Sequence, residues 1–344
     1  MANSLLTDKV IAREALMQFK NALGFTKGAN RQYDARFAKS GAKIGNSIDI
    51  RIPQRFVVND GANITSTIQD VTHQTRQLKL DQRKHVAFKF DTEELTLSID
   101  KFSETYITPA ARALANKVDV TGLALGRTAF NMVGTPGTAL TNSDFAGDAG
   151  QKLTEFACPM ENRNIILNPK AMKGVVKGDK ELFNPQAAIG EAYKKGYMSE
   201  ALGFKWMESN NIAVHTVGPL GGAPLVKGAA QTGDEIDLDG FTAAAAARLK
   251  AGDVLTFDGV YAVNPVTYES TGELQQFVVK EDVSSDGSGN ATVKISPEII
   301  TTGNLKNVTN APADNAPVLV FGHASSQANK VSPINLAYHK DAAI

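Results

Sequence analysis

Cysteine is almost absent from this chain of 344 residues, whose single example is Cys158. A lone cysteine excludes a disulfide within the chain. Since no catalytic signature surrounds it, we interpret Cys158 as a small packed side chain or an inert thiol rather than a nucleophile. The first residues lack a basic region followed by an apolar one, so we expect no secretion signal. No apolar run approaches the ~20 residues that span a bilayer, and we expect no membrane partner.

An excess of either charge is missing as well. The 36 lysines and arginines equal the 36 aspartates and glutamates, so the whole chain exerts no long-range attraction on nucleic acid or anionic lipid. A net charge of zero opposes association only weakly, which favours a self-assembling protein. The hydrophobic fraction of 42% is enough for a sizeable core, and the length allows two domains or one domain with an insertion.

Recognisable catalytic and cofactor-binding motifs are also missing. The sequence has no phosphate-binding glycine loop, no dinucleotide-binding fingerprint and no nucleophile elbow. Its five histidines are dispersed without metal-ligand spacing. Asp234, Asp237 and Asp239 lack the other positions of a calcium loop, so we interpret them as strand and turn residues. We therefore expect no enzyme, no cofactor and no metal site.

An amphipathic helix is predicted close to the start of the chain. Thr7 is a plausible N-cap, and Asp8 suits the positive end of the helix dipole. Its apolar face carries Ala12, Leu16, Phe19 and Leu23. Gly24 and Gly28 are expected to end the helix. A single amphipathic helix in this position docks either on its own fold or on a partner.

From residue 47 the hydrophobic period becomes two, which indicates strands. Ile48, Ile50 and Ile52 form one alternating run and Val86, Phe88 and Phe90 another, and we expect the two runs to pair as antiparallel strands. Leu78 and Leu80 continue the alternation between them, which predicts a two-stranded finger leaving the body; a solvated loop is an equal alternative. An isolated hairpin is only marginally stable, so a finger needs a neighbour. The candidate residues for ion pairs between subunits on this finger are Arg55, Asp60, Asp70, Arg76, Lys79, Asp81, Arg83 and Lys84.

The longest predicted helix runs from Thr108, the expected N-cap, through Pro109 to about residue 130. Its predicted apolar stripe is Ala111, Leu114, Val118, Leu125 and Ala129. Gly122 and Gly126 inside this helix each cost up to ~1 kcal/mol relative to alanine. Their presence predicts close packing or a bend at this point.

The second half of the chain alternates between mixed and nearly all-β character. We predict strands at 164–169 and 212–216, with helices at 170–176 and 182–193 between them. Glycine and proline at 218–224 mark a boundary, after which strands are predicted at 235–238, 254–257, 274–280 and 291–295, a hairpin tip at 286–290 and a helical turn at 243–250. A second boundary at 310–317 precedes short buried strands at 318–321 and 334–338. The β block is therefore expected to interrupt an α/β body.

Several stretches of the sequence resemble one family. GDVLTFDGVYAVNPV at 252–266 and STGELQQFVV at 270–279 resemble the inserted domain of major coat proteins of the P22 type from tailed phages. IILNPKAM at 165–172, GYMSEALGF at 196–204 and ESNN at 208–211 resemble further segments of that family in the same order. The resemblance implies an α+β, HK97-like capsid fold with an inserted small antiparallel β-barrel.

The resemblance also implies a division of the chain. Its parts are an N-terminal arm at 1–35, an extended loop and peripheral domain with a spine helix at 36–147, an axial domain at 148–217, the inserted β-barrel at 218–316 and an axial return at 317–344. Family members usually continue past residue 338 with more strands, so we expect that the axial return is naturally short, that it is truncated, or that the body has fewer strands here.

The function that the resemblance implies is that of a major capsid protein. Its copies would form the hexamers and pentamers of an icosahedral virion shell around double-stranded DNA, assembled in the bacterial cytoplasm. Implied partners are a scaffolding protein, a portal protein and DNA bound without sequence preference. Asp8 and Glu14 on the first helix are the candidate scaffold contacts. A phage tail or decoration protein is the alternative, and it would need neither the long helix nor the split body.

Overall fold

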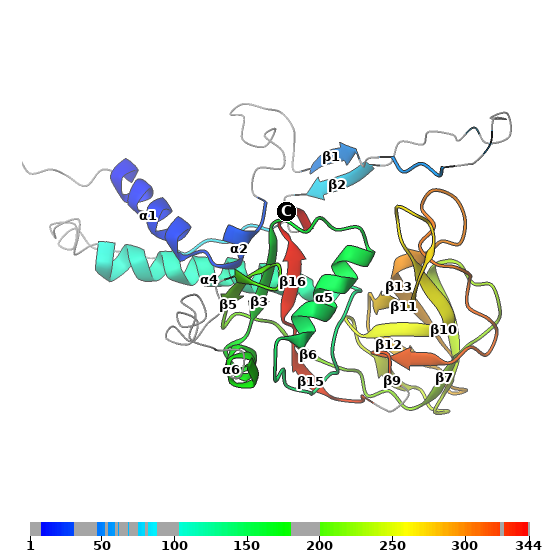
Figure 1. Ribbon diagram of the computed structural model, residues 1–344. Helices are drawn as coiled ribbons and strands as arrows, with labels where there is room; N and C mark the ends of the chain where they lie inside the picture. The colour runs from blue at the N-terminus through cyan, green and yellow to red at the C-terminus, as the bar shows by residue number, and fades with distance from the viewer. Residues whose placement is uncertain are drawn as a thin grey trace, which may run out of the picture.

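The chain folds into an α/β body and a β-rich unit, which lie side by side in Figure 1, with α1 and the β1–β2 hairpin at the periphery of the body. The computed structural model describes residues 8–30, 47–51, 54–58, 61, 68, 75–79, 82–87, 103–179, 200–323 and 327–342. Within these ranges none of the helices combines the length and the apolar character that a bilayer span needs.

The first helix, α1 (Asp8–Ala22), is confirmed and is followed by the short α2 (Phe25–Gly28). Thr7 lies outside the described residues. α1 packs along the long helix of the body, yet its predicted apolar face is only partly covered. Leu23 is buried, whereas Leu16 is 52% exposed.

The long helix consists of three pieces: a π-helical turn at Ser103–Ile107, α4 at Thr108–Ala124 and a 3-10 turn at Leu125–Thr128. Thr108 is not an N-cap, because the π-turn before it is already helical. The buried residues of α4 are Ala111, Ala115, Asp119 and Leu123. The predicted stripe is wrong beyond Val118, since Leu125 is 60% exposed. The 3-10 turn has three residues per turn, so the period of 3.6 no longer holds there.

Close packing at Gly122 is confirmed. A Cβ atom at this position would lie 2.6 Å from the Phe25 ring of α2. Phe25 belongs to a buried cluster that includes Leu123, Ile166 and Tyr338. Because Gly122 has no side chain, α2, which follows α1, packs directly on α4.

The sheet of the body has four strands in the order β16–β3–β5–β4. These strands are β3 (Arg163–Leu167), β4 (Glu200–Ala201), β5 (Phe204–Glu208) and β16 (Leu336–His339). Every residue of β3 is buried, as is typical of a central strand with a parallel neighbour. The helices α5 (Asp144–Glu155) and α6 (Pro169–Gly178) complete the body.

Two side chains fix local structure in the body. The Oδ1 atom of Asn168 caps α6 by accepting a hydrogen bond from the Ala171 amide at 2.9 Å, and Pro169 occupies the first turn. Trp206 is a buried anchor whose Nε1 donates to the Ala201 carbonyl at 3.0 Å. The helix predicted at 182–193 lies outside the described residues.

The β-rich unit, hereafter the β unit, comprises β7 to β14. Its strands are β7 (Gly222–Val226), β8 (Gly233–Phe241), β9 (Ala246–Leu249), β10 (Val254–Val263), β11 (Ser270–Val279), β12 (Val283–Ser285), β13 (Ala291–Ile299) and β14 (Val318–Val320). Six of them form one sheet in the order β14–β10–β11–β13–β8–β7. The two edges of this sheet meet, because Leu225 bridges Pro317 and the Val226 amide donates to the Ala316 carbonyl at 3.0 Å.

Two predictions about the β unit are corrected and one is confirmed. Residues 243–250 do not form a helical turn but contain β9, which pairs with β12. Alanine-rich sequence favours a helix locally, and tertiary pairing overrides that preference. The strand predicted at 318–321 does not return to the body; β14 pairs with β10. The hairpin tip at 286–290 is confirmed, since the Asp286 amide donates to the Asn290 carbonyl at 2.8 Å.

The finger is a hairpin whose second strand differs from the predicted one. β1 (Ser47–Arg51) pairs along its whole length with β2 (Thr75–Lys79), with Ser47 opposite Lys79. Residues 82–87 form no strand, so the predicted pairing with residues 85–87 is wrong, and residues 88–90 lie outside the described ranges. The observed partner closes a shorter loop, which costs less chain entropy, and it offers the same alternation.

The link between the body and the β unit is a second pair of strands. β6 (Val214–Thr216) runs toward the β unit and pairs antiparallel with β15 (Val331–Pro333), which returns from it. β6 confirms the strand predicted at 212–216, although it is shorter.

Candidate functional site

Several of the large apolar side chains that are exposed lie on α1 and on the finger. Leu16 and Met17 are half exposed on α1, and Phe56, Ile68 and Val58 are more exposed still, with Val58 at 91%. Exposed apolar side chains that a neighbouring chain can cover are a feature of protein interaction sites. We therefore treat α1 and the finger as candidate assembly surfaces.

The root of the N-terminal segment, residues 24–30, is fixed by hydrogen bonds, although the outer side of α1 is exposed to solvent. The carboxylate of Asp119, only 4% exposed on α4, accepts hydrogen bonds from the Gly24 amide at 2.8 Å and from the Thr26 hydroxyl at 3.3 Å. A buried carboxylate needs such donors to offset its desolvation. Burial, followed by the charge of Asp119, raises the pKa of the nearby Tyr338 hydroxyl above its ordinary value, so this tyrosine stays neutral.

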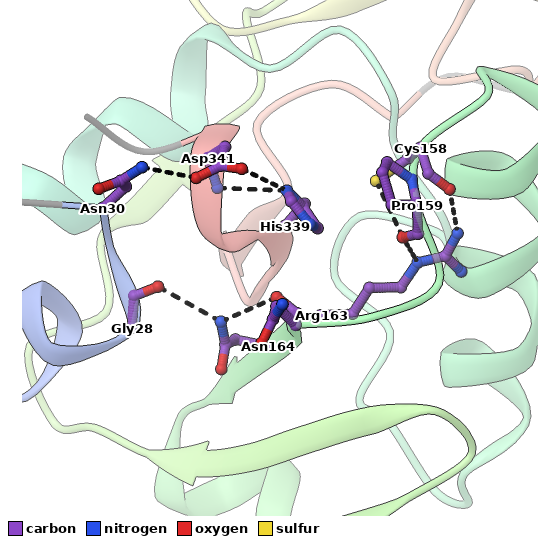
Figure 2. A network of polar contacts seen from close by, with 9 residues as sticks. Gly28, Asn30, Cys158, Pro159, Arg163, Asn164, His339 and Asp341 are labelled. Carbon is purple, nitrogen blue, oxygen red and sulfur yellow. Dashed lines mark hydrogen bonds and ion pairs between the residues drawn. The ribbon is translucent and has the colours of Figure 1, made fainter. Parts of the chain in front are cut away.

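A network of polar contacts joins the same root to the 3-10 helix Lys340–Ala342, which follows β16 (Figure 2). Asn30 Nδ2 donates to Asp341 Oδ1 at 2.7 Å, and the Asn30 amide donates to the Lys340 carbonyl at 3.1 Å. Asn164 at the start of β3 donates to the Gly28 carbonyl at 3.4 Å. Residues 28–30 and 340–341, far apart in the sequence, are thus tied together beside β3.

Arg163, at the other side of Figure 2, stabilises the local fold through hydrogen bonds. Its guanidinium is buried and donates to the carbonyls of Pro159 and Cys158 at 2.8 and 2.7 Å. It also reaches the Thr154 hydroxyl at 3.1 Å near the end of α5. These acceptors fix the turn after α5. Cys158 is half-buried and its thiol donates to the Pro159 carbonyl at 3.6 Å, in line with a packed or inert thiol.

The candidate residues for ion pairs on the finger are only partly described. Asp60, Asp70 and Asp81 lie outside the described residues. Arg55, Lys79 and Arg83 are exposed, and Arg76 stands opposite Ile50 in the hairpin register. Lys84 donates to Gln82 at 2.9 Å, and the Arg55 carbonyl accepts a hydrogen bond from Asn304 of the β unit at 3.4 Å. Their role between subunits stays a prediction.

The two candidate scaffold contacts have different positions. Asp8 is the first residue of α1. The carboxylate of Glu14 is turned toward its own chain, where Oε1 accepts hydrogen bonds from Gln18 at 2.9 Å and from the Ser103 hydroxyl at 3.1 Å. The scaffold contact stays a prediction for both residues. Sequence reasoning named these charges and missed Met17, whose exposure depends on how α1 lies on α4.

In the part of the chain that the structure describes, no group of three or more histidine, cysteine, aspartate or glutamate side chains is placed to hold an ion. Asp234 pairs instead with Lys280 at 2.9 Å. Asp237 accepts a hydrogen bond from the Thr292 hydroxyl at 2.6 Å. Both aspartates therefore act as surface strand residues, as predicted.

A body and a β unit that each bury an apolar core, beside a helix and a finger with exposed apolar side chains, are typical of a structural subunit. The family model of the P22 coat protein, gene protein 5, matches residues 1–343. The chain therefore belongs to the P22 coat protein family and is a phage major capsid protein. This confirms the resemblance seen in the sequence.

Solved structures of phage capsids are similar to this chain. A chain of Mycobacterium phage Che8 is 16% identical, with a TM-score of 0.41, over 87% of this chain and 90% of that one. The capsid of Cyanophage P-SCSP1u gives 14% identity and a TM-score of 0.35 over 80% and 83%. The CUS-3 coat protein I-domain is 25% identical, with a TM-score of 0.20, over 33% of this chain and 100% of that one. No curated protein matches this chain.

Proposed function

We propose that copies of this chain form the hexamers and pentamers of a closed icosahedral head shell around double-stranded DNA. One observation carries the proposal: the body and the β unit each bury an apolar core, whereas Leu16, Met17, Phe56 and Val58 stay exposed on the arm and the finger. Burying such side chains against neighbours stabilises a contact by ~25 cal/mol per Å² of apolar area. Each contact is modest, and many identical contacts add up around a shell.

We further propose an HK97-like arrangement with the β unit as an inserted barrel. The bridge between Leu225 and Pro317 joins the two edges of the six-stranded sheet, which supports closure, because closing a sheet removes its free edges. The proposed division is arm 1–35, extended loop and spine helix 36–147, axial domain 148–217 and inserted domain from 218. We place the end of the insertion after β14 rather than at 316, since β14 pairs with β10.

The proposed partners follow from the same role. A scaffolding protein would contact α1 at Asp8 and Glu14, a portal protein would occupy one vertex, and DNA would meet the inner face without sequence preference. The balanced charge of the chain limits DNA contact to weak, local attraction. We propose no catalytic activity and no cofactor. Assembly would take place in the bacterial cytoplasm.

Electron microscopy of the purified chain, expressed with its neighbouring gene products, tests this function. We expect shells for the natural sequence and their loss in the double variant Phe56→Asp, Val58→Asp, because charged side chains cannot be buried in an apolar contact without a large cost. The melting temperature should stay unchanged, since both residues are exposed.

Met160→Asp is the matched control, because Met160 is 71% exposed on a loop that belongs to neither the arm nor the finger. We expect it to keep the shells. Tubes or lone particles from the natural sequence, or normal shells from the double variant, would contradict the proposal.

A further inference from the structure

The joint between the β unit and the body is built from specific polar contacts. The chain crosses it twice, outward after β6 and back before β15. These crossings are bonded to each other, since the Val217 amide donates to the Lys330 carbonyl at 3.0 Å and the Asn329 amide donates to the Gly218 carbonyl at 3.2 Å. Paired crossings alone form a narrow ribbon, which twists easily. Three further contacts stand beside this ribbon.

The first contact joins β11 to the loop after the long helix. Gln276 Oε1 accepts a hydrogen bond from the Met132 amide at 2.7 Å, and Gln276 Nε2 donates to the Met132 carbonyl at 3.1 Å. The side-chain amide thus pairs with both polar groups of one backbone residue, as a neighbouring strand would. The Met132 side chain also packs against the core of the β unit. Both kinds of contact hold the loop against β11.

The second contact is a buried carboxylate at the entry to the β unit. Asp253 is fully buried. Its Oδ1 accepts a hydrogen bond from Nε2 of His215 in β6 at 2.8 Å, because a carboxylate can only accept. Its Oδ2 accepts from the amides of Gly218 at 3.1 Å and Lys250 at 2.9 Å. One carboxylate therefore connects β6, the outward crossing and the turn before β10.

Glycine is required beside this carboxylate. Gly252 has φ +99°, a conformation that disfavours residues with a side chain, and a Cβ atom there would lie 3.2 Å from the His215 ring. The close approach lets the imidazole reach Asp253. The third contact lies farther along, where the Thr135 hydroxyl and His323 Nε2 are 3.0 Å apart.

We infer that Gln276, His215 and His323 are positioning residues that hold the β unit at one orientation on the body, and that this orientation sets the geometry of the assembled shell. Two bodies joined at one point can rotate about it, whereas contacts at three separate points fix their relative angle. Subunits in a closed shell repeat the same contacts at fixed angles, so a loosened joint produces irregular curvature. This inference rests on the proposed shell-forming function.

The test compares two glutamines, in different places, whose side-chain amides each pair with both polar backbone groups of one residue. Gln276→Met keeps the side-chain volume and removes both bonds across the joint. Gln231→Met is the control, because Gln231 pairs in the same way with the Asp237 backbone inside the β unit, at 2.7 and 3.2 Å. Hydrogen exchange on the unassembled full-length chain measures how often the backbone amides of the joint are exposed to solvent. We expect the Val217 and Asn329 amides to exchange on the order of tenfold faster in Gln276→Met, the size that the loss of two neutral hydrogen bonds implies.

Two milder variants test the joint even if Gln276→Met fails to fold. His215→Gln removes the imidazole from Asp253, and Thr135→Val removes the hydroxyl at a half-buried position; each should accelerate exchange at the same two amides by a smaller factor. Gln231→Met should leave these amides unchanged. Equal exchange in all variants, or equal acceleration by Gln231→Met, overturns the inference.

Electron microscopy then measures the diameters of assembled particles. We expect a wider spread of diameters, or open and curled sheets, for Gln276→Met and a natural distribution for Gln231→Met. Regular shells from a chain whose joint exchanges faster would overturn the claim about geometry. If the natural sequence formed no shells, the proposed function would fail, while the exchange measurement would still decide whether the three contacts hold the joint.

Discussion

The β unit and the finger are both β structure, yet they are stabilised in opposite ways. The β unit buries apolar side chains from all of its strands in one cluster that includes Leu238, Phe257 and Phe277, and the edges of its main sheet meet. The finger has two paired strands, and Phe56 and Val58 lie exposed beside them. Since apolar burial is the main driving force of folding, the β unit is stabilised by its own chain, whereas we expect the finger to need neighbours.

The largest expected effect comes from truncating the core of the β unit. Phe257 is fully buried and its ring centre lies 5.3 Å from that of Phe277. Phe257→Ala should lower the free energy of unfolding by ~3–5 kcal/mol, because it removes apolar burial and leaves a cavity. Urea unfolding of the unassembled chain measures it.

The same truncation in the finger is the control for this comparison. Phe56→Ala should change the free energy of unfolding by no more than ~0.5 kcal/mol, because Phe56 is mostly exposed. A comparable loss from both substitutions would show that the finger is already packed within one chain, and the contrast between the two regions would disappear.

A smaller effect is expected at the root of the N-terminal segment, which lies between the two extremes. Asp119→Ala leaves the Gly24 amide and the Thr26 hydroxyl without their buried acceptor, so it should cost ~1–3 kcal/mol. Hydrogen exchange should accelerate at Gly24. Thr26→Val removes only the longer of the two bonds and should have a weaker effect; an equal effect would mean that Asp119 acts through packing alone.

The smallest effect is expected on the surface of the β unit. The hydrogen bond from Lys280, and then its charge, hold the pKa of Asp234 below 3.8. Lys280→Ala should therefore raise this pKa toward 3.8, as measured by NMR titration of the side chain. A lowered pKa stabilises the folded state above pH 3.8, and this contribution is lost as the pH falls through the folded-state pKa. In the variant the pH dependence of stability should flatten in that range; an unchanged titration would show that the ion pair does not persist in solution.

Local sequence signals were sufficient wherever neighbouring residues decide the structure. The helical pattern from residue 170 predicted α6, Asp286 and Asn290 predicted a tight tip, and the alternation of Ile48 and Ile50 predicted β1. The close packing at Gly122 was also predicted from the sequence. Each of these depends on backbone propensity, capping or residue size, which act over a few residues.

Other features depended on contacts between distant segments. The helical preference of residues 243–250 yielded to pairing between β9 and β12, and β14 joined β10 instead of the body. For the finger, several stretches had suitable alternation, and the sequence pattern alone did not select β2 as the partner of β1. Alternating patterns specify that a strand has a buried face, but they do not specify its partner.

The amino-acid sequence by itself determined that this chain has a helix at its start, a long second helix, a β block between α/β segments, and the family to which it belongs. Only the tertiary structure decided that Asp119 anchors the N-terminal segment and that Gln276, Asp253 and His323 meet the body at the joint. The physical reason is the distance along the chain over which each effect acts. Propensities and caps act between neighbours in the sequence. A buried carboxylate meets its donors only after burial of the core has brought together segments about a hundred residues apart, such as Gly24 and Asp119.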